Sequence, residues 1–143
     1  MSNHLINHIP GTNLHIADQI GVCDINQLRS YDIKHVFNVS AIVIDEFPGI
    51  SYNYISIWDD PSFDIISVIE KLCPVLENID ENIVINCQAG ISRSASVIIG
   101  YLIYKGSTYE DAYDLLKSCR DIIKPNGGFI TSLRKYELKI KSV

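Results

Sequence analysis

The fold is decided by the stretch Ile83–Tyr104, which reads IVINCQAGISRSASVIIGYLIY. It opens with an apolar, β-branched run from Ile83 to Ile85, which predicts a buried strand. Cys87 then begins a segment of small residues, and a helical pattern starts at about Arg93. A strand, a loop and a helix N-terminus in this order predict an anion site, because backbone N–H groups there can point at one ligand.

Cys87 and Arg93 are separated by five residues, and this spacing indicates which anion the loop binds. A loop of this length can wrap one tetrahedral phosphate while the guanidinium forks onto two of its oxygens. Gly90 supplies a backbone conformation that other residues resist. The helix dipole and the inward N–H groups favour the thiolate of Cys87. We therefore expect the thiolate to displace an alcohol or phenol from phosphate, giving a phosphocysteine that water hydrolyses.

Such chemistry also requires a proton donor for the leaving group. Asp59 and Asp60 follow a predicted strand that should lie beside the loop, and a carboxylic acid in this position can act as a general acid. Asp59 is the preferred candidate and Asp60 the second. The alternative interpretation is that one or both aspartates cap a turn.

Strand and helix patterns alternate along the chain. The predicted strands span residues 14–17, 34–40, 51–57 and 83–85, and the predicted helices span about 24–30, 64–76, 93–104 and 108–118, with a last helix to about 140 after a turn at 125–128. Pro74 should kink the second helix or end it early. This alternation predicts an α/β fold, a single domain with a mostly parallel central sheet flanked by helices.

Size and composition agree with one domain and exclude several classes of function. The chain has 143 residues, of which 47% are hydrophobic and 20% charged, with a net charge of −5. This charge argues against broad nucleic-acid or acidic-membrane binding. No apolar run is long enough to span a membrane, and no signal pattern is found, so a cytoplasmic location is expected. The four cysteines are spread without a C-x-x-C pair, so neither metal nor disulfide scaffold is expected, and no cofactor.

The segment Asn-Cys-Gln-Ala-Gly-Ile-Ser-Arg-Ser, residues 86–94, resembles the signature of the dual-specificity protein phosphatases, in the cysteine-based tyrosine phosphatase superfamily. The resemblance continues over most of the chain. Residues 33–39 are similar to the family's early strand, residues 54–59 to the strand that ends in its general acid, residues 95–104 to its signature helix, and residues 120–129 to its closing motif. It implies a tyrosine-phosphatase-like fold, with residues 1–12 as an N-terminal extension and 13–143 as the catalytic domain of a small, atypical member.

The resemblance also implies roles for individual residues. Cys87 is the nucleophile, and Asp59 protonates the leaving oxygen and then activates the hydrolytic water. Ser94 stabilises Cys87 when it becomes the leaving thiolate. Phosphate is held by the guanidinium of Arg93 and by the backbone N–H groups of Gln88, Ala89, Gly90, Ile91, Ser92 and Arg93. Arg120 is a candidate contact for a second phosphate or an acidic substrate residue, and the alternative is an ordinary partner of a helix C-terminus.

One position departs from the family pattern. The family usually has histidine immediately before the cysteine, and this chain has Asn86. That histidine helps to brace the loop and to favour the thiolate. Asparagine can donate a hydrogen bond but carries no charge, so we expect a working enzyme in which Cys87 needs a higher pH to ionise than in its relatives.

The preferred function is dephosphorylation of phosphoproteins at phosphotyrosine, phosphoserine and phosphothreonine, with a phosphoprotein as the partner. The loop side chains are neutral, which disfavours phosphoinositides. The alternatives are a phosphatase of RNA 5′ ends or other non-protein phosphates, a catalytically weak module that binds phosphoresidues, and unrelated chemistry such as sulfur transfer or arsenate reduction. Sulfur transfer and arsenate reduction are disfavoured, because the folds that carry out these reactions do not require the Asp59 loop or the Pro125–Asn126 turn.

Overall fold

In a computed structural model, which describes residues 4–142, a five-stranded sheet separates two groups of helices. The strand order is β1-β2-β5-β3-β4, with β5 (Asn82–Asn86) in the centre. β2 (Leu14–Ala17) and β3 (Ile33–Asn38) lie on either side of β5 and run parallel to it, and β4 (Ser51–Tyr54) runs parallel to β3. This confirms the predicted α/β architecture.

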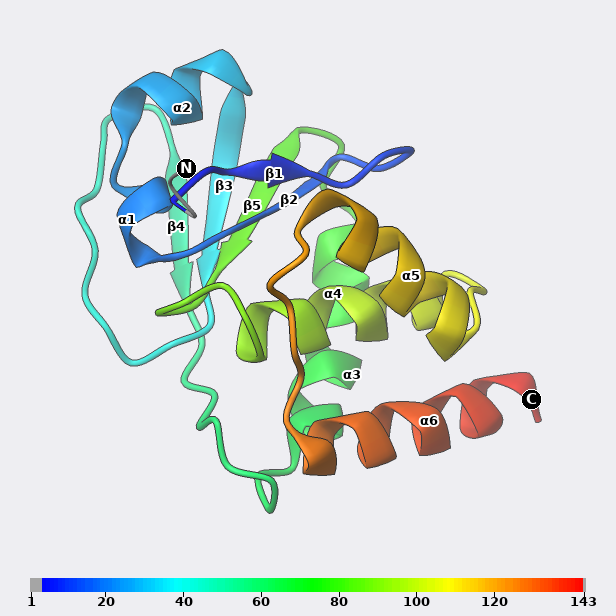
Figure 1. Ribbon diagram of the computed structural model, residues 1–143. Coiled ribbons are helices and arrows are strands. Elements are labelled where there is room, and N and C mark those ends of the chain that lie inside the picture. Colours follow the sequence, from blue (N-terminus) through cyan, green and yellow to red (C-terminus); the bar gives the residue numbers. More distant parts are fainter. Residues whose placement is uncertain (1–3, 143) are drawn as a thin grey trace.

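Two short helices cover one face of the sheet and four longer ones cover the other (Figure 1). The short helices are α1 (Gln19–Val22) and α2 (Ile25–Ser30). The longer ones are α3 (Ile65–Glu77), α4 (Arg93–Tyr104), α5 (Tyr109–Cys119) and α6 (Gly127–Lys141). α4 packs against the other three long helices and against β2 and β5. The helix that follows the predicted anion loop is therefore the centre of the larger core.

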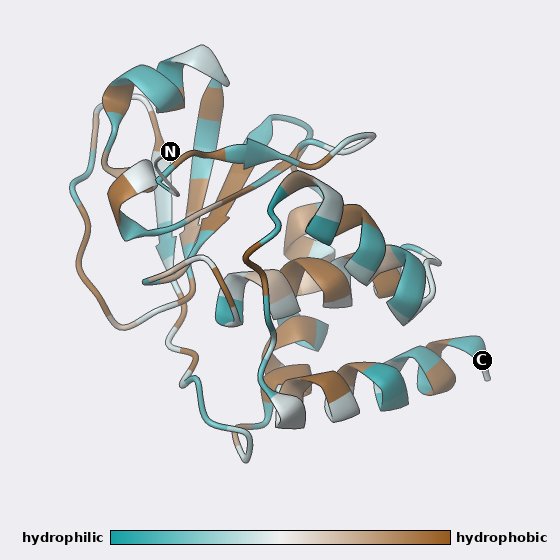
Figure 2. Ribbon diagram, in the orientation of Figure 1, coloured by the Kyte–Doolittle hydropathy of each residue, from teal (hydrophilic) through white to brown (hydrophobic). Residues whose placement is uncertain are grey.

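Two apolar cores explain why the successive residues 83–86 of β5 are all buried. Ile83 and Ile85 face the four-helix side, and Val84 faces the side of α1 and α2. Because side chains alternate along a strand, a central strand covered on both faces is apolar throughout. Figure 2 shows this as brown colouring along β5 and α4, with teal on the outer turns of α5 and α6. The strand that carries the cysteine is held rigidly from both sides.

The N-terminal segment differs from its predicted role as an extension. β1 (Asn7–His8) lies within it and pairs antiparallel with β2. Ile6 and Ile9, on either side of β1, are fully buried in the two cores. Burial of two isoleucines stabilises the fold by about 3–6 kcal/mol. The described part of this segment, from residue 4 onward, is thus an edge of the sheet. The strand predicted at 14–17 is confirmed with the same bounds, but it is the second strand and not the first.

Other boundaries also differ from prediction. β4 ends at Tyr54 rather than at 57, because the chain leaves the sheet after the N–H of Ile55 donates to Asn38 O at 2.9 Å. α3 does not end early at Pro74 but continues to Glu77. The flanking Cys73 and Leu76 are buried, which offsets the lost hydrogen bond. The glycines predicted as a turn at 127 and 128 form the first turn of α6, which Asn126 caps.

None of the helices in the described range is long and apolar enough to cross a membrane.

Candidate active site

The predicted anion loop lies at the carboxyl end of the central strand, where ligands bind in open parallel sheets. Cys87 follows β5 directly, and α4 begins at Arg93, as predicted. Cys87 is 2% exposed and Ser94 is fully buried, so the candidate nucleophile lies at the floor of the site. The segment from Cys87 to Ser92 therefore connects the central strand to a helix that is buried along most of its length.

The loop is held by hydrogen bonds to its carbonyl groups, all from outside it. The donors are Gln19 N to Gln88 O (3.1 Å), Arg120 Nη2 to Ala89 O (3.3 Å), Arg120 Nε to Gly90 O (2.9 Å) and Lys124 N to Ile91 O (2.8 Å). In a trans peptide the carbonyl and the following N–H point to opposite sides. With these carbonyls turned outward, the next N–H groups turn toward the inside of the loop, where an anion would bind.

The thiol of Cys87 lies on that inner side. Gly90 N donates to Sγ at 3.2 Å, and the hydroxyl oxygen of Ser94 lies 3.1 Å from Sγ. The structure thus brings together Cys87 and Ser94 as predicted from the sequence. A backbone N–H and a hydroxyl placed at the sulfur can stabilise negative charge there.

Gly90 makes this loop shape accessible. Its φ is +65°, a region that side-chain-bearing residues rarely adopt. A Cβ atom at this position would also lie 2.7 Å from Arg120 Nη2 and 3.0 Å from the backbone of Ala17. The glycine is needed both for the backbone angle and for close approach of the groups behind the loop.

Arg93 begins α4 at the rim, where it is half-buried. Its Nη1 donates to Ile57 O at 3.2 Å, in the segment that leads to Asp59. One hydrogen bond to a carbonyl leaves other N–H groups of the guanidinium for an anion. This contact ties the candidate phosphate-binding arginine to the segment that carries the candidate acid.

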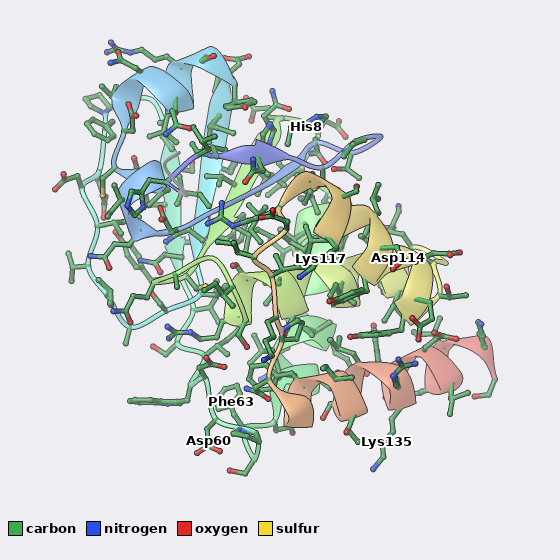
Figure 3. All side chains as sticks on the ribbon, viewed as in Figure 1. His8, Asp60, Phe63, Asp114, Lys117 and Lys135 are labelled. Atoms are coloured by element: carbon green, nitrogen blue, oxygen red, sulfur yellow. The ribbon has the colours of Figure 1, made fainter. Side chains whose placement is uncertain are left out.

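Asp59 lies against the loop, and Asp60 does not. The Oδ1 atom of Asp59 accepts from Ser92 Oγ and from Asn126 Nδ2, both at 2.8 Å. Asp60 instead accepts from the N–H and the hydroxyl of Ser62, and these bonds lower the pKa of Asp60. Figure 3 shows Asp60 on the outer side of the loop before α3. Asp60 therefore has the turn-capping role that was the alternative interpretation, and Asp59 is the acid nearer the site.

The start of α6 presses directly on this acid loop. A Cβ atom on Gly128 would lie 2.0 Å from Pro61 O, so only glycine permits the contact. Asn126 caps α6 through its Oδ1, which accepts from Phe129 N, and its Nδ2 donates to Asp59. The contacts of Ser92 and Asn126 with Asp59 were not predicted individually. The Pro-Asn-Gly-Gly motif in the sequence indicated a turn at residues 125–128, but it did not indicate which residues this turn contacts.

Arg120 is not at the substrate face, which corrects the prediction of a contact with a second phosphate. It is 4% exposed and lies behind the loop, where it binds the carbonyls of Ala89 and Gly90. The position at the end of α5 did not reveal this, because the backbone turns extended at Arg120 and carries the side chain under the loop.

Asn86 does not replace the family histidine by a hydrogen bond to the loop. The residue is fully buried, and within the described range neither its Oδ1 nor its Nδ2 has a hydrogen-bond partner. Its backbone oxygen accepts from Val39 N at 2.8 Å. The side chain is therefore buried without a hydrogen bond that would brace the loop, and its expected effect on the ionisation of Cys87 stays a prediction.

A large cavity in the described part of the chain lies away from the loop. A cavity of about 870 Å³ lies at the opposite end of the sheet, lined among others by His8 (labelled in Figure 3), Asn82 and Lys105. None of its lining residues belongs to the loop or to the acid segment. From residue 4 to 142, no three His, Cys, Asp or Glu side chains lie close enough to hold a metal ion, and the cysteines are free.

The site combines three features: a thiol at the floor of a loop with inward N–H groups, an arginine where the following helix begins, and a carboxylic acid at the rim. Together they are typical of the cysteine-based phosphatase class of site. Comparison with family models identifies the family within this class. Residues 15–139 match the family model described as dual specificity phosphatase, catalytic domain. The chain belongs to this family.

Individual relatives agree. A probable dual specificity protein phosphatase of Dictyostelium discoideum is 39% identical over 120 residues, which is 81% of this chain and 30% of that protein. Mouse dual specificity protein phosphatase 19 is 32% identical over 128 residues, 86% of this chain and 58% of that protein. The chain thus spans less than two thirds of the length of these relatives.

Solved structures extend the similarity to the whole fold. Human DUSP28 superposes with a TM-score of 0.88 at 26% identity, covering 95% of each chain. A mouse dual specificity phosphatase complexed with zinc tungstate superposes with a TM-score of 0.89 at 26% identity, covering 97% of this chain and 90% of that one.

Proposed function

We propose that this chain hydrolyses phosphomonoesters on proteins, at phosphotyrosine and at phosphoserine or phosphothreonine, through a phosphocysteine intermediate. The observation that carries the proposal is the position of Asp59. Its carboxylate is bound by Ser92, within the same loop whose floor is Cys87. A cysteine loop without a nearby acid would favour a module that only binds phosphoresidues. Cys87 together with Asp59 favours an enzyme that hydrolyses them.

The first step is transfer of the phosphoryl group to sulfur. The Cys87 thiolate attacks phosphorus, the S–P bond forms, and the bond to the leaving oxygen breaks. That oxygen takes a proton from Asp59. Because Oδ1 already accepts two hydrogen bonds, Oδ2 is the oxygen of Asp59 that carries the proton. Arg93 and the loop N–H groups bind the remaining phosphate oxygens, where charge is greatest in the transition state.

The second step releases phosphate. Water attacks phosphorus and gives a proton to the Asp59 carboxylate, and the S–P bond breaks. Ser94, whose oxygen is 3.1 Å from Sγ, donates to the thiolate as it leaves. Asp59 ends protonated and Cys87 ends ionised, so the site returns to its starting state.

The substrate class is proposed from the family and the site together. The family model and the relatives are named for dual specificity, and the side chains of the loop are neutral apart from Arg93. A mouse relative was solved with tungstate, a tetrahedral oxyanion like phosphate. An intracellular location stays a prediction.

Turnover of p-nitrophenyl phosphate by the wild type, Cys87→Ser and Asp59→Asn tests the mechanism. We expect activity in the wild type and none in Cys87→Ser. Asp59→Asn should lose about 10²–10⁴-fold on phenyl phosphate, a second substrate whose leaving group is poor, as expected for removal of a general acid. A wild type without turnover, or a Cys87→Ser variant as active as the wild type, would refute the proposal. Phosphopeptides, a phosphoinositide and a 5′-phosphorylated RNA then separate the substrate classes.

A further inference from the structure

Arg120 connects the phosphate loop to the N-terminal segment. Its guanidinium donates to Gly90 O at 2.9 Å and to Ala89 O at 3.3 Å on one side. On the other side, Nη1 donates to Leu5 O at 3.0 Å and to Asn7 Oδ1 at 2.9 Å. The side chain thus links two segments more than eighty residues apart, and the second of them precedes the region that the family model covers.

The N-terminal acceptors are fixed in place. Asn7 lies in β1, which pairs with β2, and the intervening Ile6 is buried in the core. The N–H of Ile6 also donates to Gln27 Oε1 at 2.7 Å, which anchors the segment to α2. Since both acceptors sit on anchored backbone, the planar guanidinium has a defined orientation rather than a range of rotamers.

We propose that Arg120, oriented by Asn7, is a positioning residue that holds the phosphate loop in its anion-binding shape; this inference rests on the proposed phosphatase function. By fixing the carbonyls of Ala89 and Gly90 outward, Arg120 turns the N–H groups of Gly90 and Ile91 inward. The hydrogen bond from Gly90 N to Cys87 Sγ is the visible result.

The hydrogen bonds from Arg120 to the loop carbonyls can be tested by substituting its side chain, whereas the other two carbonyl contacts of the loop come from backbone groups. The carbonyls of Gln88 and Ile91 are held by the backbone N–H groups of Gln19 and Lys124, which only proline would remove, and proline would also restrict the backbone there. Arg120 also lies in a buried setting, where burial lowers its pKa and the nearby Asp18 and Cys87 oppose that shift. A lysine at this position keeps a charge but cannot reach four acceptors with a forked geometry.

The variants are Arg120→Lys, Arg120→Met, Asn7→Ala and Asn7→Asp, with Asn53→Ala as the matched control. Asn53 is an exposed asparagine on β4, the other edge strand of the sheet. Asn53→Ala therefore measures how much the loss of an edge-strand asparagine by itself changes activity and melting temperature. Each variant is assayed for kcat and KM with p-nitrophenyl phosphate, for inhibition by phosphate and by orthovanadate, and for melting temperature.

We expect kcat to fall on the order of 100-fold in both Arg120 variants, because misdirected N–H donors no longer match the transition state. Asn7→Ala should lose about tenfold, and Asn7→Asp, which keeps an acceptor oxygen facing Arg120, should recover most of that loss. Inhibition by vanadate, which takes five-coordinate geometry, should weaken more than inhibition by phosphate. A residue with only a structural role would lower the melting temperature and leave both inhibition constants unchanged.

Unchanged kcat and vanadate inhibition in Asn7→Ala and Arg120→Lys would overturn the inference, as would an Asn7→Asp variant no better than Asn7→Ala. Protection of Cys87 by phosphate against iodoacetamide gives a readout without turnover. If the wild type shows protection but no hydrolysis, the proposed activity fails. The role of Arg120 is then decided by whether its variants lose that protection.

Discussion

A methyl group added at Gly128 should displace the candidate acid and leave the nucleophile in place. The Cβ of an alanine there would lie 2.0 Å from Pro61 O and 2.6 Å from Pro61 C and Cα. These are backbone atoms, so no side-chain rotation relieves the contact. The acid loop or the start of α6 has to move, and Asp59 lies two residues before Pro61.

The size of the movement follows from the geometry. An ordinary contact of about 3.4 Å needs the two backbones to separate by about 1.4 Å. The hydrogen bond from Asn126 Nδ2 to Asp59 Oδ1, now 2.8 Å, would lengthen beyond hydrogen-bonding distance. A displacement of about 1 Å at a reacting group can cost 10²-fold, and general acid catalysis supplies about 10²–10⁴-fold. We expect kcat to fall between about 10- and 100-fold where the leaving group needs a proton.

The neighbouring Gly127 provides the control, because a Cβ atom there meets nothing within 4 Å. Gly127→Ala and Gly128→Ala are compared on phenyl phosphate, a poor leaving group, and on a substrate whose leaving group is stable without a proton. Gly127→Ala should behave as the wild type on both. Gly128→Ala should lose activity chiefly on phenyl phosphate, with the rate of Cys87 alkylation unchanged.

Two results would refute this reasoning. Wild-type kcat on phenyl phosphate in Gly128→Ala would mean that the contact with Pro61 does not position Asp59. An equal loss on both substrates, with slower alkylation of Cys87, would mean that the substitution disturbs the whole site rather than its acid. Thermal unfolding of both variants shows whether the protein remains folded at the assay temperature.

Further expectations concern single side chains. Ser94→Ala should slow dephosphorylation of the intermediate on the order of 100-fold, so that rapid-quench experiments detect a burst of phenol and accumulated phosphocysteine at Cys87. Asp60→Asn should leave kcat near wild type on phenyl phosphate, because its hydrogen bonds end within its own turn, and a loss comparable to that of a missing acid would contradict this. Asn86→Leu should raise the free energy of unfolding in urea by about 1–2 kcal/mol, since it removes a buried amide that has no partner among the described residues, and destabilisation would show that the amide is satisfied. Burial lowers the pKa of His15 from 6.5, so the unfolded chain takes up a proton first as the pH falls; the free energy of unfolding should therefore decrease below about pH 6.5, and His15→Gln should flatten that decrease.

The sequence by itself determined where the candidate reaction centre lies, because that information is local. The run from Ile83 to Ile85, the five-residue spacing of Cys87 and Arg93, and the apolar helix that follows lie within one short stretch. Hydrophobic periodicity and turn residues predict the structure of a few neighbouring positions. An anion loop between a strand and a helix can be predicted from such local patterns, because all of its residues lie within one short segment. The parallel sheet followed in the same way, from strands that alternate with helices.

The tertiary structure decided everything that depends on which distant segments meet. The sequence favoured Asp59 over Asp60 without showing what either residue contacts, and the hydrogen bonds from Ser92 and Asn126 place Asp59 against the loop. Arg120 follows a helix in a place where a substrate contact was a fair prediction, yet its side chain turns under the loop to reach Asn7. These outcomes depend on hydrogen bonds across tens of residues, and the sequence pattern around each residue carries no record of its partner.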